Sequence, residues 1–187
     1  MPYPAHLHTG RPLPPVVEAV PHQGKQLIEI ILLKDELLHD IQSDIVRVEK
    51  SRKLEVPVLT NEDADGYNLN RKIDNYVNKA VARMQAYLLL PSPFVHRIST
   101  NHTRLWEEAS IYLALPHNWA PHCIDPLRDA VHNYIVKSVE YELMAVVLPN
   151  DPYTVICKTD ADRAYNDINA LINTRLGPTR IHPTPFG

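Results

Sequence analysis

Proline divides this chain into a few segments that can form regular structure. The sequence holds 17 prolines in 187 residues, and six of them fall within residues 1–23. Because proline lacks an N–H group and fixes φ, it ends helices and is excluded from central strands. Residues 1–23 and residues 177–187, "GPTRIHPTPFG", are therefore predicted to be extended arms on either side of a helical domain that spans residues 24–176.

Composition limits the class of protein. The chain is 44% apolar, which suits a globular core, and its 19 basic against 22 acidic residues give no general reason to expect nucleic acid or an anionic membrane as a partner. Apolar runs such as "LIEIILL" are too short to span a bilayer, and no signal peptide is evident. The five glycines are too widely spaced for a phosphate-binding loop, and Cys123 and Cys157 have neither disulfide-framework nor metal spacing.

Hydrophobic periodicity predicts five helices, so the expected fold class is mostly α, a bundle of about five helices. The first runs from residue 24 to about residue 50, with Lys34 reaching out of its apolar stripe. The second begins at Asn68 or Asn70 and extends toward Pro91, and the third covers residues 103–115. The short segment "FVHRIS" is either a brief strand or an irregular crossing. The first helix rests on a stripe of Leu27, Ile31, Leu38, Ile41, Ile45 and Val48.

The last two helices have the clearest starts. Asp125 and Asp151 each precede a proline, the pairing expected for an N-cap residue followed by the first helical position. Arg175, Gly177 and Pro178 then give the usual order of a helix end. We therefore predict two long helices packed as an antiparallel pair.

Two segments resemble metal sites and fail in detail. Residues 61–72, "NEDADGYNLNRK", match part of a calcium loop, but Lys72 stands where a bidentate glutamate is required, so an acidic turn before a helix is the better interpretation. His117, His122 and Cys123 lie within seven residues, yet no second cluster accompanies them, and exposed or hydrogen-bonded side chains are expected. We predict no metal and no cofactor.

No pattern of residues predicts an enzyme. The paired acids at Glu107 and Glu108, and at Asp160 and Asp162, diverge on a helix, and neither cysteine has the sequence context of a nucleophile. Nine tyrosines favour either an interface or, for Tyr76, Tyr112 and Tyr134, an ordinary core.

Assembly is the function that these features favour. An extended proline-rich arm loses little conformational entropy when it binds a neighbour. In the C-terminal arm Phe186 is expected to anchor in a pocket, Ile181 to add apolar contact and Arg180 to pair with a carboxylate at its rim. The remaining interface candidates are His182, Pro183 and Pro185 in this arm, and Tyr3, Pro4 and Leu13 in the N-terminal arm.

The C-terminal half resembles a known class of proteins. The stretches "DPLRDAVHNYIVKSVEYELMAVVLPNDP" and "AYNDINALINTRLGPTRIHPTPFG" are similar to small structural proteins of tailed phages and prophages of gut Bacteroidetes, in the helical head-tail connector class. The resemblance covers roughly residues 105–187. It implies a virion subunit that forms a homo-oligomeric ring below the portal and contacts portal or tail proteins, with DNA only passing through the channel. It implies no catalytic residues and a docking role for residues 180–186.

Two other functions stay open at this stage. One is a monomeric helical adaptor or regulatory module that binds a cellular protein, and the other is an enzyme with helix-borne acids. A ring subunit is expected to show a large discrete mass, whereas an adaptor is expected to be a stable monomer of about 21 kDa.

Overall fold

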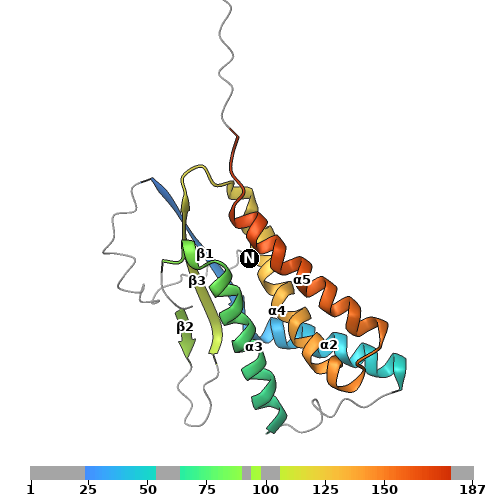
Figure 1. Cartoon of the computed structure of the whole chain (residues 1–187). Coiled ribbons are helices and arrows are strands. Elements are labelled where there is room, and N and C mark those ends of the chain that lie inside the picture. Colours follow the sequence, from blue (N-terminus) through green and yellow to red (C-terminus); the bar gives the residue numbers. More distant parts are fainter. Residues whose placement is uncertain (1–23, 54–63, 90–93, 98–105, 178–187) are drawn as a thin grey trace, which may run out of the picture.

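A computed structural model of the chain describes residues 24–53, 64–89, 94–97 and 106–177. These residues form a three-stranded sheet and four α-helices (Figure 1). In chain order the elements are β1 (Lys25–Leu33), α2 (Lys34–Arg52), α3 (Ala64–Arg83), the 3₁₀ turn η2 (Gln85–Tyr87), β2 (Phe94–Arg97), β3 (Trp106–Pro116), the 3₁₀ turn η3 (Pro121–Cys123), α4 (Ile124–Val147) and α5 (Pro152–Ile172).

The sheet is antiparallel, with strand order β1-β3-β2. On one of its faces the register pairs Ile28 with Leu113, Ile30 with Ile111 and Leu32 with Ala109, and all six side chains are buried in the core. Both α2 and α4 pack against this sheet. The apolar alternation of β1 therefore gives the domain one covered sheet face.

Helix α4 contacts the other three described helices, with α3 on one side, α5 on the other and α2 behind it in the view of Figure 1. Its buried residues occur on nearly all of its sides, which a helix surrounded by neighbours requires. The pair α4 and α5 forms the predicted antiparallel hairpin and has the most extensive contact between any two elements described. The domain is mostly helical, as the sequence predicted.

The prediction of one helix from residue 24 to residue 50 is wrong in its first part. Residues Lys25–Leu33 form β1, and the helix begins only at Lys34. Leu27 and Ile31, which belong to the predicted helical stripe, are 47% and 39% exposed, whereas Ile28 and Ile30 are buried. A short run rich in isoleucine fits both the 3.6-residue period of a helix and the two-residue period of a strand. Pairing with β3 stabilises the strand.

The predicted helix over residues 103–115 is also wrong, because residues Trp106–Pro116 form β3. This strand lies at the centre of the sheet, and both its inward residues and the outward Ser110 and Ala114 are buried. Burial on both faces hides the alternation by which a half-buried strand is usually identified. The described residues therefore form four α-helices, one fewer than the number expected for the chain.

The predicted helix starts have different outcomes. Asp151 is the N-cap of α5, since its carboxylate accepts a hydrogen bond of 2.8 Å from the N–H of Tyr153. Asp125 is not an N-cap, because η3 leads into α4 and the helix already includes Ile124. Helix α3 begins at Ala64, earlier than predicted, and residues Phe94–Arg97 form a strand, one of the two alternatives for "FVHRIS".

Two side-chain predictions concern the core. Lys34 does not reach out of its stripe: it is 2% exposed, and its ammonium lies 3.9 Å from Asp74. Tyr134 is a core residue, and its ring packs edge-on against Tyr76 and at a tilt against Tyr165. The core interpretation of the tyrosines is therefore right for Tyr134.

The two ends of the described domain lie at one loop. The N–H of His117 donates to the carbonyl of Gly24 at 3.1 Å, and the N–H of Leu176 donates to the carbonyl of Asn118 at 2.7 Å. The two predicted arms therefore join the domain at the same place. Apart from Gly177, both arms and all nine interface candidates, Tyr3, Pro4, Leu13, Arg180, Ile181, His182, Pro183, Pro185 and Phe186, lie outside the described residues.

Candidate functional site

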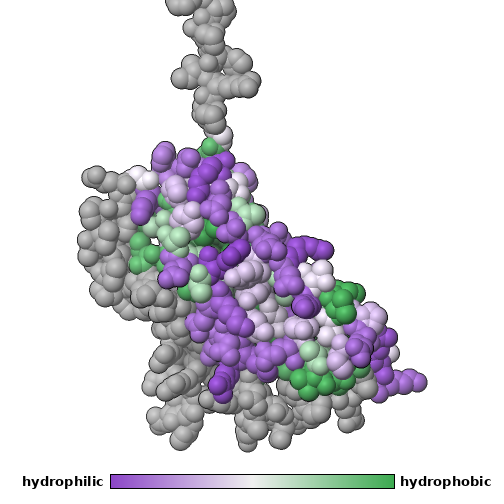
Figure 2. Space-filling model, in the orientation of Figure 1, coloured by the Kyte–Doolittle hydropathy of each residue, from purple (hydrophilic) through white to green (hydrophobic). Residues whose placement is uncertain are grey.

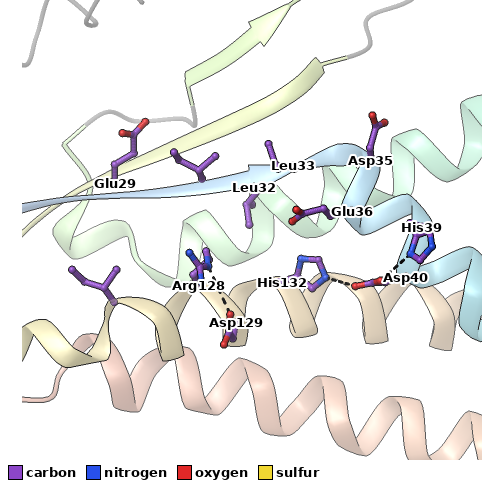
Figure 3. Close-up of a pocket in the computed structure, with 12 residues that line it drawn as sticks. Glu29, Leu32, Leu33, Asp35, Glu36, His39, Asp40, Arg128, Asp129 and His132 are labelled. Atoms are coloured by element: carbon purple, nitrogen blue, oxygen red, sulfur yellow. Dashed lines mark hydrogen bonds and ion pairs between the residues drawn. The ribbon is translucent and has the colours of Figure 1, made fainter. Parts of the chain in front are cut away.

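A groove of about 900 Å³ lies beside β1 (Figure 3). One wall is the strand itself, the second is the start of α2, and the third is the N-terminal half of α4. Its lining residues are Glu29, Ile31, Leu32, Leu33, Asp35, Glu36, His39, Asp40, Ile124, Arg128, Asp129 and His132.

The groove follows the free edge of a strand. Among the described residues β1 pairs only with β3, and three consecutive residues of β1, Ile31, Leu32 and Leu33, line the groove although their side chains alternate between the two faces of the sheet. A strand edge of this kind presents backbone N–H and C=O groups that an added strand can bind.

The walls of the groove are acidic. Among the described residues that line it, five carry carboxylates, Glu29, Asp35, Glu36, Asp40 and Asp129, and one, Arg128, is an arginine. Two of these acids occupy the first turn of α2, where the partial positive charge of the helix N-terminus stabilises them. The groove is therefore suited to a cationic ligand.

A hydrogen bond between α2 and α4 lies at one end of the groove. The Nε2 atom of His132 on α4 lies 2.9 Å from a carboxylate oxygen of Asp40 on α2, and His39 lies 3.3 Å from the other oxygen of this carboxylate (Figure 3). The hydrogen bond from His132 holds the pKa of Asp40 below its ordinary value. This contact joins α2 to α4.

Apolar side chains lie exposed along the same strand. Leu27, Ile31 and Leu33 are 47%, 39% and 39% exposed. They project from the sheet face opposite the helices, and Ile31 and Leu33 also border the groove. Exposed leucine and isoleucine in a row on an edge strand are typical of a surface that another chain covers.

A second polar cluster is buried between α2, α4 and α5. The ammonium of Lys137 donates to Asp44 at 2.7 Å and to Glu140 at 2.9 Å, and the hydroxyl of Tyr153 donates to Glu140 at 3.0 Å. The thiol of Cys157 lies 3.4 Å from this same carboxylate, whose side chain is fully buried. Lys137, Tyr153 and Cys157 thus all contact the carboxylate of Glu140, and Asp44 is a second partner of Lys137.

The chemistry of this cluster is structural. Burial raises the pKa of Glu140, and it raises the pKa of Cys157 to about 12, so this thiol is protonated at neutral pH and is no nucleophile. Burial also raises the pKa of Tyr153. The cluster consists of hydrogen bonds that join three helices.

The structure separates the residues of the suspected metal motifs. His117 and His122 are exposed, as predicted, whereas Cys123 is buried. Lys72 lies in α3 and forms an ion pair with Glu142 of α4. Both cysteines are free thiols, and within the described ranges no group of three His, Cys, Asp or Glu side chains is arranged to hold a metal ion.

The sequence-based predictions missed the groove. Its acids come from three separate elements, and the strand that organises them was assigned to a helix. The burial of β1 alternates, with Ile28, Ile30 and Leu32 inward, but the outward Leu27, Ile31 and Leu33 are apolar too, so the sequence alone does not show this alternation.

Comparison of the chain with protein-family models, curated proteins and solved structures gives no match. In the part of the chain that the structure describes, none of the helices is long and apolar enough to cross a membrane. The groove and the edge strand β1 are therefore the features from which a function is inferred.

Proposed function

We propose that this protein is a structural subunit that assembles with copies of itself, and that the free edge of β1 is an assembly surface. The observation that carries the proposal is the nine-residue strand β1, whose edge borders an open groove and whose outward face holds exposed leucine and isoleucine. Soluble monomers normally shorten, charge or cover such an edge.

A second exposed apolar patch supports the proposal. Val146, Val155 and Ile156 are 83%, 58% and 53% exposed, and they lie at the end of the domain where α4 turns into α5. Figure 2 shows apolar surface in this region, at the lower right. A subunit with two distinct apolar surfaces can contact a neighbour on each side, as closed rings require.

The likeness of residues 105–187 to head-tail connector proteins of tailed phages extends the proposal. In this form the subunit is a virion component that closes into a ring, contacts portal or tail proteins and lets DNA pass through its channel. In this form the two proline-rich end segments, residues 1–23 and 177–187, supply further contacts between subunits.

The native mass of the full-length protein tests this proposal. Light scattering after gel filtration, over a range of concentrations, is expected to give a discrete multiple of 21.3 kDa. Ile31→Lys is expected to weaken assembly at least tenfold, because the ammonium would lose water at the interface. Asn166→Lys adds the same side chain on the exposed surface of α5 and serves as the control. A monomer at every concentration would instead favour the adaptor function.

A further inference from the structure

The groove beside β1 has the shape and charge of a receptor for an extended, basic segment. Its strand edge offers backbone donors and acceptors, and the described residues of its walls include five carboxylates and one arginine. Figure 3 shows Glu36 and Arg128 pointing into the space between β1 and α4. An added strand would gain main-chain hydrogen bonds from β1 and charge pairing from the walls.

We propose that this groove receives residues 179–186 of a second copy of the chain, which add as a strand along the free edge of β1 with Arg180 paired to Glu36. This inference rests on the proposed function, since it assigns one contact of the assembly. Glu36 is exposed and forms no ion pair with the described residues, whereas Asp35 interacts electrostatically with Lys34. Asp40 and Asp129 likewise already have partners in His132 and Arg128.

The charge of the C-terminal segment is complementary to the groove. Residues 178–187 contain Arg180 and His182 and no acidic side chain, and Ile181 supplies an apolar group of the kind that the outward face of β1 exposes. The segment before β1 is less suitable, because residues 1–23 include Glu18.

The spacing of the prolines allows a strand in one register. In a strand, the N–H groups of alternate residues point to the same neighbour. Between residues 179 and 186 the prolines are Pro183 and Pro185, both at odd positions, so every even-numbered residue keeps an N–H group for β1. In residues 1–23 the adjacent Pro14 and Pro15 remove a donor in either register.

The length of the C-terminal segment favours docking on a second copy over docking on its own chain. The segment leaves the domain at Gly177, beside the loop that binds Gly24 at the start of β1. Arg180 is three residues beyond Gly177, about 10 Å at a strand's rise, whereas Leu33 lies eight residues beyond Lys25, roughly 26 Å along the strand. The arginine of the same chain therefore stops short of Glu36.

A charge exchange in the full-length protein tests the pairing. Glu36→Arg and Arg180→Glu are each expected to raise the dissociation constant of the assembly at least tenfold, and the double variant is expected to recover most of that loss. Asp167→Arg, on the exposed surface of α5, is the control and is expected to assemble like the wild type. Failure of the double variant to recover would overturn the pairing.

Mixing the two single variants distinguishes a neighbour from the same chain. Glu36→Arg keeps an intact arm and Arg180→Glu keeps an intact groove, and the changed arm and changed groove are also complementary in charge. An arm that docks on a neighbour is therefore expected to restore assembly in the mixture, with equal numbers of the two variants in each complex by native mass spectrometry. If the arm occupied its own groove, mixing would yield only monomers, and the proposal would be refuted.

A matched pair of proline variants tests the strand. Thr184→Pro removes an N–H group that faces β1 and is expected to weaken assembly roughly tenfold, whereas Thr179→Pro removes one that faces away and is expected to have little effect. Equal effects would refute strand addition. If the wild type assembles while the groove and arm variants assemble equally well, the proposed function stands and this inference fails; a monomeric wild type refutes both.

Discussion

Replacing Lys137 by methionine is expected to destabilise the fold by about 3 kcal/mol at neutral pH. The ammonium of Lys137 forms ion pairs with two carboxylates, those of Asp44 at 2.7 Å and Glu140 at 2.9 Å. The side chain of Glu140 is fully buried. Removing one member of a buried pair costs about 3–5 kcal/mol, because the charge that remains is uncompensated. We expect the lower end of this range, since about a quarter of the Lys137 side chain is exposed and water screens part of the charge.

The loss depends on pH in a direction that follows from Glu140. Burial raises the pKa of this carboxyl, and the hydrogen bond from Lys137 opposes the rise, so the pKa increases further in the variant. A carboxyl whose pKa is higher in the folded state than in the unfolded state favours folding at low pH and loses that contribution as pH rises through its folded pKa. The difference in stability between wild type and variant is therefore expected to be largest at neutral pH and to shrink toward pH 5.

Urea unfolding followed by circular dichroism at pH 7.5 and pH 5 measures both effects. In thermal unfolding, a loss of about 3 kcal/mol in the free energy of unfolding is expected to lower the melting temperature by roughly 6–12 °C for a chain of this size. Lys158→Met, at an exposed position of α5, is the matched control and is expected to change stability by less than about 0.5 kcal/mol. Glu140→Gln removes charge without leaving a carboxylate unpaired and is expected to cost less than Lys137→Met. A loss below about 1 kcal/mol, or a difference that grows toward pH 5, would refute the reasoning.

Three further substitutions have defined outcomes. Trp119→Phe removes the hydrogen bond of 3.0 Å from its indole nitrogen to the carbonyl of Leu171 and leaves a gap at a fully buried site, so thermal unfolding is expected to show a loss of about 2–3 kcal/mol. Asp151→Ala removes an N-cap and is expected to cost about 0.5–2 kcal/mol in urea unfolding. Asp125→Ala is expected to cost less, about 0.3–1 kcal/mol, because this exposed carboxylate caps no N–H group and interacts only with the dipole of α4 and, at 3.2 Å, with the exposed Arg128; equal losses would contradict the assignment.

The sequence predicts the helical hairpin well and the sheet poorly, for a physical reason. In α5 the local signals agree: Asp151 caps, Pro152 begins the helix, and apolar residues recur at helical spacing. In β1, Leu27 and Ile31 fit a helical stripe while Ile28 and Ile30 fit a strand, and only pairing with β3, more than 70 residues away, selects the strand. Local patterns do not contain this information.

The candidate site could not be predicted from sequence for the same reason. Glu36 and Arg128 are ordinary surface residues of two helices in the sequence, and they face one groove only because β1 and α4 lie side by side. The charge and proline spacing of residues 178–187, in contrast, can be read directly from the sequence. The sequence thus describes the proposed ligand, and the fold is needed to find its receptor.

The single loop that binds both ends of the domain has a consequence for chain connectivity. Gly24 and Leu176 bind to the adjacent residues His117 and Asn118, so a linker of a few residues can join them without disturbing either strand or helix. New termini can then open at Asn150, in the exposed turn between α4 and α5. Such a circular permutant retains the β1–β3 register and the α4–α5 pairing while it presents its termini at the opposite end of the domain.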